Sequence, residues 1–145
     1  MELKDIMAIS GHSGLFKFIS QGRHGIIVES LVDGKRNNVS ASAKVSALSD
    51  IAIFTNDAEV PLKEVLKKIR EAENGAQAIS HKSDDKELKK YFEKVLPDYD
   101  RERVYASDIK KVINWYNQLQ SLNVLDILDV EEKQSEEKTD TEEKK

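Results

Sequence analysis

Side chains that could act in catalysis or bind a metal are few in this sequence. The three histidines, His12, His24 and His81, all fall in segments predicted to be turns or loops. None lies on a predicted helix with a second histidine or a carboxylate four residues away, which would place two metal ligands on one face. Histidine transfers protons near neutral pH, but isolated histidines of this kind predict structural or solvated roles. The absence of cysteine excludes disulfides, thiolate catalysis and cysteine-ligated metal sites.

Two short motifs also bear on catalysis. Gly11-His12-Ser13-Gly14 misses the G-x-S-x-G spacing of a hydrolase nucleophile by one residue, and a predicted strand follows it, so a simple turn is favoured. The segment Asp98–Arg103 groups carboxylates that could do acid–base work or hold a divalent cation. Its two arginines can neutralise these acids locally, which favours a salt-bridged loop that sets the angle between two helices. We therefore predict that the protein is not an enzyme and has no catalytic residues, no cofactor and no metal.

Four residues are candidates for binding a partner. Arg23 and the pair Lys35-Arg36 fall in predicted turns at hairpin tips, where they could approach a nucleic-acid backbone or an acidic peptide. Charged residues at hairpin tips can also serve only to keep a protein soluble, without binding a partner. Trp115 lies on the flank of a helical apolar stripe and could cover the junction between two halves of the molecule or contact a second subunit. These alternatives stay open at this point.

The elements that would position these residues change type near Asp57. Before it, short β-branched segments separated by turns predict strands at residues 15–19, 26–32, 35–40 and 50–54, with a helical turn at 45–48. Asp33-Gly34 is the strongest hairpin signal. Residues 1–56 are predicted to form a small antiparallel β-barrel, SH3-like or Tudor-like and closed or nearly closed, because closure hides the sheet edges. A module of this size is marginal alone and should pack on the helices of the second half.

Residues 57–128 keep apolar side chains at spacings of three and four, which predicts three amphipathic helices. The resulting fold class is α+β, with the N-terminal barrel packed on a C-terminal three-helix module and a seam at residues 57–59. Residues 129–145 are predicted to be a disordered charged tail, because Val130 is the one apolar side chain in 130–145. The predicted helix limits are Pro61 to Asn74-Gly75, Ser83 or Asp84 to Pro97, and a start near Ser107.

The charge distribution bears on partners and location. The formal net charge is −4, and residues 1–56 hold 6 basic and 5 acidic groups. This is not the strong positive excess typical of nucleic-acid binding, which lowers that interpretation without removing it. The acidic amino terminus does not resemble a secretory signal, and no apolar run approaches the ~20 residues of a membrane span. A cytoplasmic protein without a membrane association is predicted.

A family resemblance is carried by several segments, namely Ser10–Gln21, Val28–Leu31, Asp33–Arg36, Ala47–Ile53, Val60–Leu62 and Leu96–Tyr105, ending near Tyr116. Together they resemble an uncharacterised family of small bacterial proteins, known as a domain of unknown function. The resemblance covers residues 5–120, most of the predicted ordered chain, and implies an SH3-like N-terminal part and a helical C-terminal part. It implies no activity, cofactor or site residue.

The leading functional hypothesis is a non-catalytic protein-binding or adaptor module that uses the barrel–helix junction to bind an unidentified protein partner. The alternative is an RNA- or DNA-associated accessory protein that uses the hairpin tips at Arg23 and Lys35-Arg36. A third hypothesis, an enzyme, would require a deep pocket with convergent ionisable groups around His12 or His24. The sequence does not predict an oligomeric state.

Overall fold

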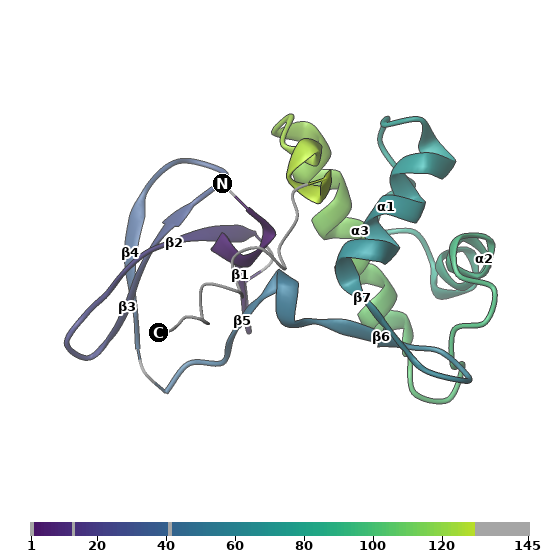
Figure 1. Cartoon of the computed structure of the whole chain (residues 1–145), viewed down its shortest axis with the longest axis horizontal. Coiled ribbons are helices and arrows are strands. Elements are labelled where there is room, and N and C mark those ends of the chain that lie inside the picture. Colours follow the sequence, from purple (N-terminus) through teal and green to yellow (C-terminus); the bar gives the residue numbers. More distant parts are fainter. Residues whose placement is uncertain (1, 13, 41, 130–145) are drawn as a thin grey trace, which may run out of the picture.

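A computed structural model describes residues 2–12, 14–40 and 42–129. Ser13 and most of the predicted tail, residues 130–145, lie outside the described residues. The fold is α+β, as predicted, with a five-stranded antiparallel sheet on one side of the molecule and three helices on the other (Figure 1). Among the described residues, no helix is long and apolar enough to cross a bilayer. The strands are β1 (Ile6–Ile9), β2 (Leu15–Gln21), β3 (Gly25–Ser30), β4 (Arg36–Ser40), β5 (Val45–Ala47), β6 (Ala52–Phe54) and β7 (Glu59–Pro61), and the helices are α1 (Leu62–Glu73), α2 (Asp85–Val95) and α3 (Ala106–Ser121).

The predicted closed barrel is not formed. The strand order is β4-β3-β2-β1-β5, so β4 and β5 are the two edges of an open sheet and do not pair with each other. The segment 50–54, predicted as the last strand of the barrel, contains β6, which instead pairs with β7. The sheet thus lacks the strand that was expected to close it. The predicted seam at residues 57–59 falls in and just after the turn between β6 and β7.

Two further details of the first half differ from prediction. Strand β1 was not predicted, although it pairs with both β2 and β5 and is central to the sheet. Residues 45–47, predicted within a helical turn, form β5, and a short 3-10 helix follows at Leu48–Asp50. Val45 is β-branched and fits a pleated strand, and its pairing with Ile9 decides between the two conformations.

One large apolar core joins the sheet to the helices. Leu3, Ile6, Leu15 and Leu48 from the first half are fully buried in the same cluster as the apolar stripes of all three helices. A second, smaller cluster forms around Ile9, Phe16 and Val28, with side chains from all five strands. Because side chains alternate along a strand, the two clusters lie on opposite faces of the sheet. The first half is therefore part of the same folded body as the helices.

The three predicted helices are present, and their ends have the expected chemistry. Helix α1 ends where Asn74 (φ 54°) and Gly75 (φ 80°) adopt left-handed conformations, which glycine and asparagine tolerate best. The Asp84 side chain accepts a hydrogen bond of 2.9 Å from the backbone N–H of Glu87 at the start of α2. At the start of α3, the N–H of Tyr105 donates to the Asp108 carboxylate at 3.0 Å. Local sequence therefore determines where each helix begins or ends.

Replacing Asp84 by alanine is expected to lower the free energy of unfolding by about 1 kcal/mol, because the first turn of α2 loses its side-chain cap. Urea denaturation followed by circular dichroism measures this change. Lys86→Ala, an exposed substitution in the same turn, is the control and should change stability by much less. Equal effects of the two substitutions would contradict the capping role.

Candidate functional site at the sheet–helix junction

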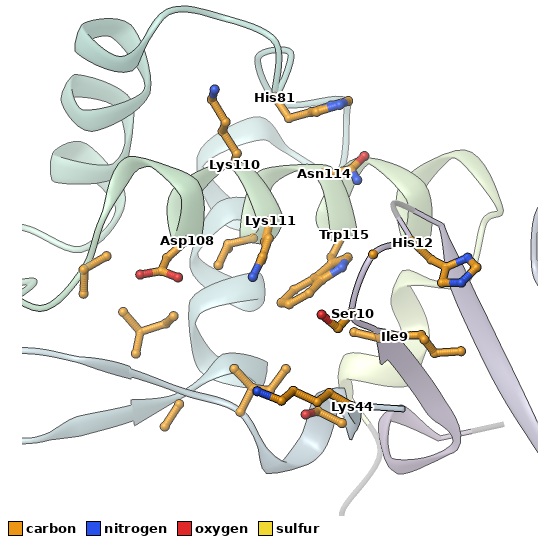
Figure 2. A pocket seen from close by; sticks show the side chains of 18 of the residues that line it. Ile9, Ser10, His12, Lys44, His81, Asp108, Lys110, Lys111, Asn114 and Trp115 are labelled. Carbon is orange, nitrogen blue, oxygen red and sulfur yellow. The ribbon is translucent and has the colours of Figure 1, made fainter. Parts of the chain in front are cut away.

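A cavity of about 660 Å³ lies where the sheet meets α3. Its walls come from the end of β1 and the turn after it, from β5 and β6, and from one side of α3 (Figure 2). This volume falls in the range of about 300–1,000 Å³ that is usual for ligand sites. Segments far apart in the sequence therefore build one concave site at the junction of the two halves.

The floor of this cavity is apolar. Val112 and Trp115 stand one helical turn apart on α3, and Ile53 of β6 lines the same space. Trp115 is 9% exposed, so most of the indole is packed into the core while one part borders the cavity. Of the two locations left open for Trp115, the structure places it at the junction between sheet and helices.

The rim of the cavity is mostly cationic. Lys44, Arg103, Lys110 and Lys111 line it, while Asp108 is the one carboxylate among the described lining residues. A protein with a formal net charge of −4 thus concentrates positive charge around this cavity. Such a local excess favours anionic groups at the mouth of the cavity.

Two of these cations already have partners. Lys110 lies 3.7 Å from the Asp85 carboxylate of α2, and Arg103 lies 2.8 Å from that of Asp100. Lys44 and Lys111, by contrast, form no ion pair with any residue that the structure describes. In Figure 2 the Lys111 side chain extends from α3 beside Trp115, and the Lys44 side chain extends along the facing wall of the cavity. They are the cations available to a ligand.

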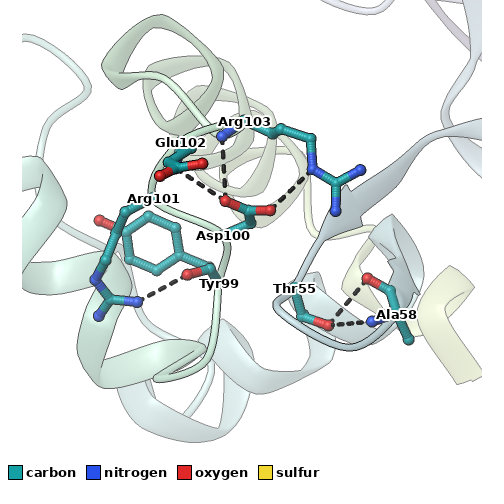
Figure 3. Close-up of polar contacts among 7 residues, drawn as sticks. All are labelled: Thr55, Ala58, Tyr99, Asp100, Arg101, Glu102 and Arg103. Carbon is teal, nitrogen blue, oxygen red and sulfur yellow. Dashed lines mark hydrogen bonds and ion pairs between the residues drawn. The ribbon is translucent and has the colours of Figure 1, made fainter.

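The loop between α2 and α3 holds Arg103 at the rim. The N–H of Asp100 donates to the carbonyl of Phe54 at 2.9 Å, which ties the loop to β6. Arg103 Nε donates to the Asp100 carboxylate at 2.8 Å (Figure 3). The Arg103 guanidinium also lies 4.3 Å from the Phe54 ring centroid. Arg101 pairs with Glu93 at 2.7 Å. Of the ion pairs predicted within this loop, the one between Arg103 and Asp100 is confirmed, whereas Arg101 pairs with a carboxylate of α2.

The same loop is fixed to the core by Tyr99. This residue is buried, packs edge-to-face on Phe92 with ring centroids 5.1 Å apart, and forms an isolated β-bridge with Thr55. Arg101 lies over the outer side of the Tyr99 ring at 4.3 Å and donates to the Tyr99 carbonyl at 2.7 Å. Aromatic packing and backbone pairing together make this wall of the cavity rigid.

Acid should weaken the attachment of Arg103. The hydrogen bond from Arg103, followed by the backbone N–H of Glu102, holds the pKa of Asp100 below its ordinary value of 3.8. A carboxylate with a lowered pKa stabilises the fold above its unfolded pKa and loses that contribution as the pH falls through its folded pKa. We therefore expect Asp100→Asn to lower the melting temperature at neutral pH and to match the unmodified protein well below pH 3.8. Thermal unfolding at several pH values tests this, with exposed Asp98→Asn as control; a deficit unchanged in acid would contradict it.

A second cavity of about 480 Å³ continues the first along α3. His81 and Asn114 line both cavities, so the two meet there. Val32, 71% exposed, and Leu122, 37% exposed, border the second cavity. We call the two cavities together the junction groove.

One wall of the junction groove is the segment between α1 and α2, which α3 holds in place. Asn117 accepts a hydrogen bond from the N–H of Ala78 at 2.8 Å and donates to the carbonyl of Ile79 at 3.0 Å. Tyr116 donates its hydroxyl to the carbonyl of Ala76 at 2.7 Å. These bonds give the backbone N–H and C=O groups of an irregular segment the partners that a helix or sheet would otherwise provide. This wall is therefore preformed.

The pocket that an enzyme would require beside His12 is present, but the ionisable groups do not converge in it. Figure 2 shows His12 and Asp108 at opposite ends of the cavity, and the ring of His12 turned away from Trp115. No ion pair joins a histidine to a carboxylate within the described ranges, and no cluster there has the ligands for a metal. His24 is exposed and lines neither cavity.

The basic hairpin tips do not form one surface. Arg23 lies in the turn between β2 and β3, whereas Lys35 and Arg36 lie between β3 and β4 or at the start of β4. Consecutive turns of an antiparallel meander lie at opposite ends of the sheet, here separated by six-residue β3, about 20 Å long. Arg36 also pairs with Glu29 at 3.5 Å. All three cations are exposed and lie outside the junction groove.

Sequence reasoning selected Trp115 but missed Lys44 and Lys111. A signal for Lys111 is present in the periodicity of the third helix, because residues 108, 111, 115 and 118 form a stripe beside the buried one. Lys44 has no such signal, because its position at the cavity depends on the pairing of β5 with β1. Neither segment alone indicates that the two lysines share a site.

Two domain families match successive parts of the chain. Residues 3–48 match a domain of unknown function, DUF5606, and residues 51–119 match another, DUF6852. A solution NMR structure of a protein from Bacteroides vulgatus, determined by a structural genomics consortium, is 48% identical in sequence, with a TM-score of 0.73. The match covers 84% of this chain and 88% of that one. The comparison with curated proteins found no match.

Proposed function

This chain belongs to an uncharacterised bacterial family that joins the two domains of unknown function, and from that premise we propose that it is a non-catalytic docking module for a segment of another protein. The observation that carries the proposal is the junction groove. It combines an apolar floor, a charged rim and walls that are held in place before any ligand arrives. Preformed concave surfaces of this kind lose little entropy when they bind.

The dimensions of the junction groove favour a chain segment as its ligand. Its lining residues on α3 and at the C-terminal end of that helix run from Asp108 to Leu122, which corresponds to about 21 Å along the helix axis. Six or seven residues of an extended peptide, at about 3.3 Å each, span this length. A partner bound in this way would place side chains in both cavities.

The alternative function, an RNA- or DNA-associated accessory protein, has weaker support. Such a protein would have to contact phosphates at Arg23 and at Lys35-Arg36, which lie at opposite ends of the sheet. Phosphate contacts supply most of the non-specific affinity for nucleic acid, and a divided basic surface with a net charge of −4 is poorly suited to this.

The finer description of the first half as an SH3-like barrel, opened between β4 and β5, is also part of our proposal. It is supported by the apolar cluster to which all five strands contribute and by the irregularity in β2 between Phe18 and Ser20, where a sheet can bend sharply. Small barrels of this class serve many unrelated functions, so the fold alone does not identify the partner.

Site-specific photocrosslinking in cells that naturally make the protein tests the docking function. A photoreactive residue at Ser46, exposed on β5 and in the lining of the groove, is expected to crosslink to protein partners. The same residue at Lys89, exposed on α2 outside the groove, is the matched control. We expect crosslinks specific to position 46 that survive RNase treatment. Equal labelling at both positions, or loss of every partner with RNase, would contradict the proposal.

A further inference from the structure

Resting on the docking function proposed above, we infer that the partner segment is acidic, with an aromatic or large aliphatic residue that inserts against Trp115 and with Asp or Glu within two positions on either side. The inserted side chain would fill the first cavity. The flanking carboxylates would pair with Lys44 and Lys111. The rest of the segment would continue along α3 into the second cavity.

The charge of the rim determines the charge that we expect of the partner segment. Lys44 and Lys111 are exposed and without an ion-pair partner among the described residues, and they extend from facing walls of the cavity (Figure 2). Asp108, the one acidic lining residue, already accepts a backbone hydrogen bond from Tyr105 as part of the helix cap. A basic segment would therefore face uncompensated repulsion, while an acidic one would meet two cations.

The apolar floor of the cavity indicates that the partner segment inserts an apolar side chain. Val112, Ile53 and the edge of Trp115 offer no charged group to a ligand that reaches them. A buried aromatic or aliphatic anchor surrounded by polar contacts is the usual distribution of energy in a protein interface. A purely acidic segment would leave the remaining apolar surface of the lining, to which half-buried Ile51 and Phe54 contribute, in contact with water and would lose that contribution.

The positions of the two lysines also determine how far the acidic residues of the partner can lie from its apolar anchor. In an extended segment, residues two positions apart point to the same side and lie about 6.6 Å apart. Carboxylates within two positions of the anchor therefore stay close to the cavity walls from which Lys44 and Lys111 extend. A small anionic molecule could satisfy the lysines and the floor, but it would leave the second cavity and the exposed Val32 and Leu122 without contact. The elongated groove favours a peptide.

Selection from a random dodecapeptide phage library against the full-length protein tests the inference. The expected result is enrichment of peptides with the acid–anchor–acid pattern. Synthetic copies should lose at least tenfold in affinity for the Lys44→Glu/Lys111→Glu variant and should shift the indole N–H resonance of Trp115, the only tryptophan in the chain. Lys89→Glu/Lys90→Glu, an equal charge change on exposed residues of α2, should leave affinity unchanged.

The outcomes separate the inference from the docking function. Enriched peptides that shift the Trp115 resonance but are neutral or basic, or that bind the Lys44→Glu/Lys111→Glu variant normally, would overturn the acidic partner and leave docking intact. Enrichment of no peptide that binds at Trp115 would overturn both. Circular dichroism of every variant shows whether a loss of affinity reflects unfolding. The neutral variant Lys44→Gln/Lys111→Gln isolates the effect of charge, and it should lower the affinity for acidic peptides by less than Lys44→Glu/Lys111→Glu does.

Discussion

Leu15→Ala is expected to lower the free energy of unfolding by about 2–5 kcal/mol, the usual cost of removing a fully buried leucine side chain. Leu15 belongs to β2, yet it is buried in the core shared with α3. Its own N–H donates to the side chain of Gln118 on that helix at 3.0 Å. The substitution therefore opens a void at the contact between the two halves.

Chemical denaturation followed by two probes checks this result. Far-UV circular dichroism reports mainly on the helices, and Trp115 fluorescence reports on the junction. Because one core joins both halves, the two curves should coincide and move together to lower denaturant. Leu122→Ala, which removes the same atoms from a side chain that is 37% exposed, is the control and should have a much smaller effect. Separate transitions for the two probes would show that the halves unfold independently.

Phe92→Ala is expected to cost about 3–5 kcal/mol, because the ring is fully buried in α2 and supports Tyr99. Loss of this support should also loosen the loop that carries Arg103 to the rim of the groove. Phe18→Ala removes the same ring from a half-buried position on the sheet and is the matched control.

Two measurements separate the effects of Phe92→Ala. Denaturant unfolding gives the stability change, and amide hydrogen exchange of residues 99–104 gives the local opening of the loop. We expect faster exchange in this loop for Phe92→Ala even under conditions where the variant stays folded. An unchanged exchange rate beside a large loss of stability would show that Tyr99 is held by its bridge to Thr55 without help from Phe92.

The helices could be predicted from the sequence because their signals are local. Apolar spacing marked the buried face of each one, and Asp84 and Asn74-Gly75 marked ends by side-chain and backbone chemistry that acts within a few residues. The strands were harder, since a strand is stabilised by its neighbours. Ile6–Ile9 has no turn signal before it, and its pairing with β2 and β5 is visible only in three dimensions.

The errors in the first half and in the site share a physical cause. Closure of the sheet depended on where residues 50–54 would pair, and their partner, β7, stood beyond the expected boundary. The candidate site likewise depends on contacts across more than sixty residues of sequence, which bring Lys44 and Lys111 to one cavity. The sequence singled out Trp115 because it lies on the flank of an amphipathic helix, but it left open whether this side chain contacts the first half or a second subunit.

The open sheet has a consequence for how the protein behaves when concentrated. Unpaired strand edges can recruit identical edges from other molecules and start fibrous growth. Here β4 presents Arg36, Asn37 and Asn38, all exposed, and β5 offers only three residues for such an encounter. Because one edge strand is polar and the other is short, we expect the open sheet to resist polymerisation without closing into a barrel.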